Sequence, residues 1–399
     1  MTNALQQARE HFTAGTAHFE AGRLEAARAR FEAALALVPG RASVLANLGV
    51  TLVGLGLHAQ AIDPLQAATA ADAAQPDAWL ALGLSHKALG QWPQAAAALR
   101  QALTLGAGTA DAWLALGQCE ERNGDEAAAL RAFERVLALD ATHAAAWSAR
   151  GGLLHQAHRH AEAAQCFERA LALGADEALH RFYLASVRGD TTPAQPPRSY
   201  VEKLFDQYAG YFEKHLVEVL QYRGHEILLQ PLLGAGAHYA QVLDLGCGTG
   251  LCARLVQPYA DTIDGVDLSQ AMVEQARATG LYRSVAHEDL LPFLQASEAP
   301  CDLVIAADVF IYVGALEAVF AAVRRRLRTG GCFAFSVERH TGPEELRLLP
   351  SMRYAHAPAY VARLARTHGF VLTRQWESFL RHDQAGAIMA QYVHLGVAP

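Results

Sequence analysis

A 34-residue period runs through the first half of the chain and leaves few folds open to it. A ladder of glycines keeps this step, and a ladder of phenylalanine and leucine follows it at the same step. Small residues let two antiparallel helices approach closely, and larger ones fill the groove to the next pair. The period therefore predicts five helix pairs, starting near residues 8, 42, 76, 110 and 144. The two ladders are Gly15, Gly49, Gly83, Gly117 and Gly151, and Phe31, Leu65, Leu99, Phe133 and Phe167.

This period, with its Trp/Gly/Ala/Phe pattern, resembles the tetratricopeptide repeat (TPR). The resemblance implies a concave groove that holds peptides or protein partners. The groove would be mostly apolar and lacks the Lys/Asn/Arg set of TPR domains that clamp C-terminal carboxylates, so an apolar partner or the second domain fits better. A structural spacer or a dimerisation arm stays open. The expected lining is Phe12, Ala46, Leu80, Leu114 and Ser148, with Thr16, Val50, Leu84, Gln118 and Gly152.

A change in composition marks the end of the array. The amphipathic stretch from Glu177 to Val187 is expected to cap the last repeat. The proline-containing segment 189–198 breaks the helical pattern and is interpreted as a linker. The chain is therefore predicted to comprise a TPR array over 8–188, this linker, and a second domain over 199–399.

The second domain is organised around a strand followed by a glycine-rich turn. An apolar run over 241–245 has the length of a buried parallel strand, with Asp244 near its end, and a helix is expected from Leu251. Alternate glycines let a ligand lie against the main chain, and the helix directs free N–H groups toward it. A dinucleotide fingerprint would need a glycine where Leu251 stands, which disfavours a nicotinamide-dependent oxidoreductase. The three glycines are Gly246, Gly248 and Gly250.

The pattern Asp-x-Gly-x-Gly-x-Gly resembles motif I of the class I S-adenosylmethionine (SAM) methyltransferases. Strands and helices alternate after it, which predicts a doubly wound α/β sheet; the resemblance implies the seven-stranded Rossmann-like form. Asp267 ends the next strand, where a carboxylate can accept two hydrogen bonds from a ribose diol. The resemblance further implies that Asp289 binds the adenine amino group and the next N–H meets the ring. The predicted cofactor-binding residues are Asp244, Gly246, Cys247, Gly248, Gly250, Asp267, Leu268, Met272, Asp289, Leu290 and Asp308.

SAM chemistry sets what else the site needs. A sulfonium methyl group passes in line to a nucleophile and leaves S-adenosylhomocysteine, so positioning and exclusion of water supply much of the catalysis. An oxygen acceptor usually needs a nearby base. The candidate bases are His215, Asp308 and His356, and each also fits a structural role in local hydrogen bonding.

The acceptor is expected beside the fourth strand and its flanking segments. Arg353 and Arg381 in one pocket would suit a carboxylate or another anionic acceptor. The alternative is that the two arginines pair with acids such as Glu338 or Asp383. We expect both to converge with His356 and Tyr208 on one cavity beside the sulfonium. The substrate candidates are Tyr208, Tyr312, Arg353 and Arg381.

Charge and cysteine usage exclude several partners. The net charge of −7 gives no electrostatic case for nucleic acid or an anionic membrane. The six cysteines form no Cys-x-x-Cys pair, so neither a disulfide framework nor a zinc site is expected, and the pattern suits the cytoplasm. The start of the chain lacks the apolar run of a secretion signal. His155, His158 and His160 fit solvated helix-end histidines better than a metal site.

Three functions compete. The leading one is a SAM-dependent methyltransferase whose TPR domain recruits or orients a substrate or partner. The second is a non-catalytic or SAM-sensing TPR scaffold, and the third is the disfavoured oxidoreductase. No Asn-Pro-Pro-Tyr signature follows the fourth strand, where Asp308 stands, which argues against amino-methylation by the enzymes that use that motif. Protein, peptide and small-molecule acceptors all stay open, as does the oligomeric state.

Overall fold

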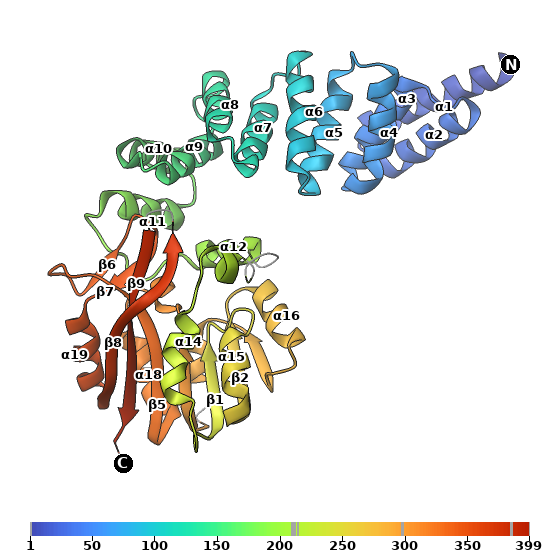
Figure 1. The fold of residues 1–399 in the computed structure, drawn as a ribbon. Helices are drawn as coiled ribbons and strands as arrows, with labels where there is room; N and C mark the ends of the chain where they lie inside the picture. Colours follow the sequence, from blue (N-terminus) through green and yellow to red (C-terminus); the bar gives the residue numbers. More distant parts are fainter. Residues whose placement is uncertain (1, 209–212, 214, 297–298, 384–385, 399) are drawn as a thin grey trace. The chain divides into compact units, whose positions relative to one another are not determined.

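The protein divides into two compact units, residues 1–175 and 176–399 (Figure 1). The computed structural model describes residues 2–208, 213, 215–296, 299–383 and 386–398. Each unit is described by itself below. No helix among the described residues is both long enough and apolar enough to cross a membrane.

The first unit is a succession of helix pairs, as the 34-residue period predicts (Figure 1). Its helices are α1 (Thr2–Glu20), α2 (Leu24–Leu37), α3 (Ala42–Gly54), α4 (His58–Ala71), α5 (Pro76–Ala88), α6 (Trp92–Thr104), α7 (Ala110–Asn123), α8 (Glu126–Leu139), α9 (Ala144–Gln156) and α10 (His160–Ala172). The expected groove residues lie on the first helix of each pair, and all of them except the buried Ala46 are half-buried. Their role in binding stays a prediction.

The glycine ladder allows the two helices of a pair to pack closely. A Cβ atom added to Gly117 would lie 2.4 Å from the Phe133 ring, and one added to Gly151 would lie 2.7 Å from Phe167. Phe133 is completely buried. The absent glycine side chain therefore makes room for the aromatic side chain 16 positions later, which explains why both ladders share one period.

The second unit begins with α11 (Glu177–Arg188), the helix that was expected to cap the array. Its buried residues Phe182 and Ala185 pack against Leu348 and Tyr354, which belong to the second unit. The domain boundaries at 188 and 199 stay a prediction. The apolar face of α11 packs against residues of the second unit.

The second unit contains one large sheet. Its order is β3-β2-β1-β4-β5-β7-β6, with β9 antiparallel to β5 and β8 antiparallel to β9. The first five strands of this order are parallel, as predicted. The short β6–β7 pair adds two strands to the expected seven. The strands are β1 (Tyr239–Leu245), β2 (Ala260–Asp267), β3 (Ser284–His287), β4 (Cys301–Ala306), β5 (Leu327–Arg339), β6 (Leu346–Leu348), β7 (Tyr354–His356), β8 (Phe370–Asp383) and β9 (Gly386–Val397).

Helices cover both faces of this sheet, which gives the doubly wound fold. Neighbouring strand residues point to opposite faces, so Leu243 belongs to the apolar cluster under α18 and α19 while Val242 belongs to the cluster under α14 and α15. The helical segments are α12 (Arg198–Tyr208), η1 (His215–Val219), α14 (Gly224–Leu229), η2 (Gln230–Leu232), α15 (Leu251–Val256), η3 (Gln257–Tyr259), α16 (Gln270–Ala278), α17 (Leu290–Gln295), η4 (Phe310–Tyr312), α18 (Glu317–Arg326) and α19 (Pro358–Thr367).

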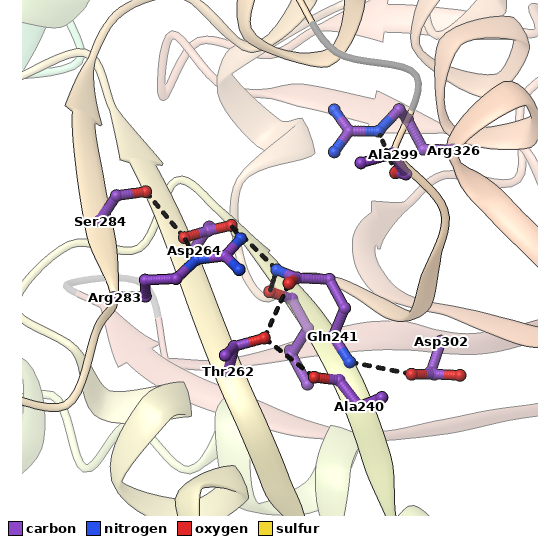
Figure 2. Close-up of polar contacts among 10 residues, drawn as sticks. Ala240, Gln241, Thr262, Asp264, Arg283, Ser284, Ala299, Asp302 and Arg326 are labelled. Atoms are coloured by element: carbon purple, nitrogen blue, oxygen red, sulfur yellow. Dashed lines mark hydrogen bonds and ion pairs between the residues drawn. The ribbon is translucent and has the colours of Figure 1, made fainter.

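A polar network ties the first strands together near their amino-terminal ends (Figure 2). The Asp264 carboxylate accepts hydrogen bonds from Gln241 Nε2 at 2.9 Å, Ser284 Oγ at 2.7 Å and Arg283 Nε at 3.1 Å. These partners come from β1, from β3 and from the residue just before β3. The network therefore helps to fix the register of three strands, whose opposite ends carry the site described next.

Residues 324–328 form a basic run, Arg-Arg-Arg-Leu-Arg, and two of its arginines have structural roles. Arg326 is buried, and its Nε donates to the carbonyl oxygen of Ala299 at 3.0 Å (Figure 2). Arg328 pairs with Asp302 at 2.8 Å.

Candidate active site

A cavity of about 740 Å³ lies at the carboxyl ends of the parallel strands in the second unit. This volume falls in the range of small-molecule sites. The turns after β1, β2, β3 and β4 all contribute to it, which is where doubly wound sheets bind their ligands. The predicted site residues that line it are Gly246, Cys247, Gly248, Asp267, Leu268, Met272, Asp289, Leu290, Asp308, Tyr312, Arg353 and Arg381.

The glycine-rich turn has the conformation that its sequence requires. All three glycines have positive φ angles: 62° for Gly246, 52° for Gly248 and 92° for Gly250. A Cβ atom on Gly246 would lie 2.6 Å from the Val309 side chain, so this position also lacks room for a larger residue. The turn contributes Gly246, Cys247, Gly248 and Thr249 to the cavity lining.

Asp267 is tied to this turn. The residue is 9% exposed; its Oδ2 accepts a hydrogen bond from Gly248 N at 2.9 Å, and its Oδ1 accepts one from Ser269 N at 2.9 Å. Burial raises the pKa of this carboxyl, although the backbone N–H groups oppose that shift. Each oxygen keeps a further lone pair for a ligand hydroxyl. The side chain is therefore held rigidly at the cavity wall.

Two predicted cofactor residues support the turn from outside the cavity. Asp244 is buried away from the lining, and its Oδ2 accepts a hydrogen bond from Tyr282 Oη at 2.7 Å. Burial raises the pKa of Asp244 to about 7. Gly250 also lies outside the lining, at the N-cap of α15, where a Cβ atom would meet Tyr282 at 3.3 Å. These two positions contact the same tyrosine and not the cavity.

Asp308 and Arg381 form an ion pair in the cavity wall. Asp308 follows β4 with a left-handed φ of 59°, and its backbone N–H donates to Ser336 Oγ at 2.8 Å. Arg381 comes from β8, is 3% exposed, and donates from Nη1 to Asp308 Oδ2. Its Nη2 lies 3.7 Å from Glu338 Oε2. Burial lowers the pKa of Arg381, but the charge and hydrogen bond of Asp308, together with Tyr312 and Glu338, more than offset this, and the pKa is raised.

The anticipated pairing of an arginine with acids thus holds for Arg381, whose partners are Asp308 and Glu338. Arg353 lines the cavity from the turn between β6 and β7. The backbone of this turn closes through a hydrogen bond from Leu349 N to the Arg353 carbonyl oxygen at 2.9 Å, and Met352 has a left-handed φ of 59°.

His356 does not join the two arginines in this cavity. It is fully buried, its Nε2 lies 2.7 Å from the Gly314 carbonyl oxygen, and its ring stacks on Tyr360. Burial lowers its pKa to about 4. Its sequence-predicted role as a base beside the sulfonium is therefore incompatible with its position.

Two further predicted residues, His215 and Tyr208, are not among the described residues that line the cavity. His215 begins η1 and is outside the described lining, whereas Leu216 and Leu220 line the cavity. Tyr208 ends α12, and its side chain lies outside the described part of the chain, as does that of Asp383.

Several cavity residues were not predicted from the sequence. His225 lines the cavity and stacks on Tyr222, with ring centroids 5.3 Å apart. Burial lowers the pKa of His225, so the ring is neutral at pH 7. Gln195 and Pro196, from the segment interpreted as a linker, also form part of the wall. No spacing in the sequence connects these positions to the glycine-rich turn.

Known proteins match both units. Residues 242–331 match a methyltransferase domain model, and residues 12–76, 80–144 and 122–178 match a tetratricopeptide repeat model. The malonyl-(acyl-carrier protein) O-methyltransferase of Salmonella typhimurium is 30% identical over 197 residues, which are 48% of this chain and 74% of that protein. The ubiquinone biosynthesis O-methyltransferase of Thiobacillus denitrificans is 30% identical over 151 residues, 32% of this chain and 63% of that protein.

The solved structure of YrrB, a TPR protein with an unusual peptide-binding site, is 23% identical, with a TM-score of 0.41 over 45% of this chain and 95% of that one. The methyltransferase relationship rests on the matched domain and on the Salmonella relative, of which the chain covers about three quarters. The chain therefore belongs to the class I SAM-dependent methyltransferases, as a member that carries TPR repeats before its methyltransferase domain.

Proposed function

We propose that this enzyme transfers the methyl group of SAM to a carboxylate oxygen of an acceptor that Arg353 binds. The observation that carries the proposal is an arginine, Arg353, in the lining of the same cavity as Asp308 and Tyr312. A guanidinium group binds a carboxylate through two parallel hydrogen bonds. Two relatives are named as O-methyltransferases, and one of them carries a malonyl group in its name, which supports an oxygen acceptor.

Another set of lining residues fits SAM by its chemistry. Asp267 offers two carboxylate oxygens to a ribose diol, and the Leu290 N–H follows Asp289 at the position proposed for adenine. Leu268 and Met272 supply apolar surface for the ring. When bound, SAM supplies an electrophilic methyl group on a sulfonium. The proposed cofactor site therefore combines one fixed acid, main-chain donors and apolar walls.

A carboxylate acceptor also suits the titratable groups at the cavity. A carboxylate is ionised at neutral pH and can attack a methyl group without a base. One oxygen of Asp308 is already engaged by Arg381, and His356 lies outside the cavity. Arg353 would orient the acceptor so that one carboxylate oxygen faces the methyl group. The C–O bond forms as the S–CH₃ bond breaks, and no proton has to be removed.

Apolar and aromatic side chains would exclude water from this step. They come from α12, η1 and the segment after it: Leu204, Phe205, Leu216, Leu220 and Tyr222. The Phe205 ring packs edge-on against Tyr312 with centroids 5.1 Å apart, so α12 and η4 meet over the cavity. We further propose that the TPR array recruits the acceptor or a protein that carries it, in the cytoplasm, and the match of residues 12–178 to the repeat model supports a binding role.

The chemical stability of the product tests the proposal. The 399-residue chain is incubated with methyl-labelled SAM and a bacterial cell extract, and the products are treated with mild base. Methyl esters hydrolyse to methanol, whereas methyl ethers, methylamines and C-methyl groups do not. We expect volatile label from the wild type and about tenfold less from Arg353→Gln. Arg347→Gln, an exposed position on β6, is the matched control and should behave as wild type. Base-stable label would refute a carboxylate acceptor, and tight S-adenosylhomocysteine binding without any transfer would favour the SAM-sensing scaffold.

A further inference from the structure

The segment interpreted as a linker contributes to the cavity of the second unit. Residues 192–197, here called the strap, run between α11 and α12, and Gln195 and Pro196 line the cavity. The strap continues into α12 through a hydrogen bond from Tyr200 N to the Pro197 carbonyl oxygen at 3.0 Å. A flexible tether would have no fixed place in a binding site. Specific contacts must therefore hold the strap against the second unit.

The main anchor is a close contact with the loop after η4. Ala315 N donates to the Ala194 carbonyl oxygen at 2.8 Å. Gly314 has a φ of 78°, and a Cβ atom there would lie 2.2 Å from the same Ala194 oxygen. This is backbone against backbone, so a side chain at position 314 would displace the strap. The loop directly follows Tyr312 and Val313, which also line the cavity.

The loop is in turn held from β7 and α19. His356 Nε2 lies 2.7 Å from the Gly314 carbonyl oxygen; because a carbonyl only accepts, this nitrogen carries the proton. Tyr360 stacks on His356 and accepts a hydrogen bond from Leu316 N at 2.8 Å. A continuous set of contacts thus leads from His356 through Gly314 to Ala194 and the neighbouring wall residues.

We propose that the strap is a fixed wall of the acceptor half of the cavity and that His356 is a positioning residue that holds it through Gly314. This proposal rests on the proposed function, because it assigns Gln195 and Pro196 to the acceptor. It predicts that a fully buried histidine outside the cavity affects the reaction, and that the chain between α11 and α12 contributes to the specificity of the enzyme.

The first test displaces the strap while the sheet stays intact. Gly314→Ala is compared, in the full chain, with Gly330→Ala, whose φ of 77° is matched but whose Cβ would meet nothing within 4 Å. Hydrogen exchange with mass spectrometry follows the peptides that contain Ala315 and residues 190–199. For Gly314→Ala we expect about tenfold faster exchange of the Ala315 amide, because its acceptor moves away. The amount of cell extract that half-saturates methyl transfer should rise about fivefold or more, while the Kd for S-adenosylhomocysteine stays within about twofold.

The second test addresses His356 by rescue. His356→Phe keeps a ring against Tyr360 but removes the donor, so it should reproduce both effects of Gly314→Ala. His356→Gln restores an N–H donor and should return exchange and half-saturation toward wild type. Unchanged Ala315 exchange in both Gly314→Ala and His356→Phe would overturn the anchoring, and altered exchange with unchanged half-saturation would overturn the acceptor wall. Wild-type protein that transfers no base-labile methyl would instead refute the proposed function, while the exchange results still decide whether the strap is anchored.

Discussion

Replacement of Asp267 by alanine should weaken cofactor binding strongly. The carboxylate is held by Gly248 N and Ser269 N, both at 2.9 Å, so its free lone pairs are oriented before a ligand arrives. Two hydrogen bonds from ribose hydroxyls to a charged acceptor contribute about 1.5–3 kcal/mol each, and together about 2–4 kcal/mol because they are not additive. The Kd for S-adenosylhomocysteine should therefore rise about 30- to 700-fold.

Titration calorimetry with S-adenosylhomocysteine measures this change directly. Asp261→Ala is the matched control, since Asp261 is an exposed acid at the opposite end of the same strand. Asp267→Ala also leaves two backbone N–H groups without their acceptor, which should lower the free energy of unfolding by about 1–3 kcal/mol. Thermal unfolding must therefore show that the variant is folded at the temperature of the titration. A folded Asp267→Ala protein with a Kd within about threefold of wild type would refute the assignment of the ribose to this carboxylate.

Two further outcomes follow from burial and hydrogen bonding. Phe133→Ala should lower the free energy of unfolding of the array by about 3–5 kcal/mol, because loss of the completely buried ring leaves a cavity beside Gly117. Chemical denaturation of the full chain measures this change, and a loss below about 1 kcal/mol would contradict the packing. Burial alone would raise the pKa of Asp264, but hydrogen bonds from Arg283 and Ser284 hold it below its usual value. The stabilisation by this carboxylate is thus present above the unfolded pKa of about 3.9 and is lost as the pH falls through the lower folded pKa. Asp264→Asn should therefore cost about 1–3 kcal/mol at pH 7, and the cost should shrink as the pH falls below about 3.9, as denaturation over a series of falling pH values would show.

The parts of the fold that the sequence predicts are those with a local or periodic cause. The glycine of Gly117 recurs in every repeat, and the position of Phe133 always carries phenylalanine or leucine, because each helix pair has the same close packing; the array is therefore visible from its period. The turn after β1 is visible because positive φ angles at alternate positions favour glycine at 246, 248 and 250. The acid at the end of β2, Asp267, is predicted because a carboxylate there can accept hydrogen bonds from a ribose diol.

The parts that the sequence does not predict depend on contacts between distant segments. The composition of the strap is that of a linker, and only its contact with Gly314, more than a hundred positions later, makes it a wall. His356 carries the chemistry of a base, but β7 buries it against a carbonyl group. The apolar face of α11 predicts a packed helix without saying which unit packs against it. Residue type and spacing contain no information about these partners.

Left-handed backbone conformations at non-glycine residues recur around the cavity. Among the described residues, three of the four non-glycine positions with positive φ lie at the cavity: Asp308 and Met352 line it, and Gln221 stands between two lining residues. Each such conformation is unfavourable by about 1–2 kcal/mol and persists only where its surroundings enforce it.

Residues 380–382 of β8 enforce two of these positive-φ conformations, those of Asp308 and Gln221. Arg381 holds the Asp308 carboxylate, while on either side Leu380 O accepts from Arg223 N at 3.2 Å and His382 N donates to Leu220 O at 2.8 Å. The side chain of one residue and the main chain of its neighbours therefore fix both the turn after β4 and the turn around Gln221. This arrangement explains why an arginine that was expected to bind an acceptor is buried in an ion pair. Its position near the carboxyl end of β8 lets it set the shape of the cavity, while Arg353, on the turn with the third strained residue, is the arginine that we propose for the acceptor.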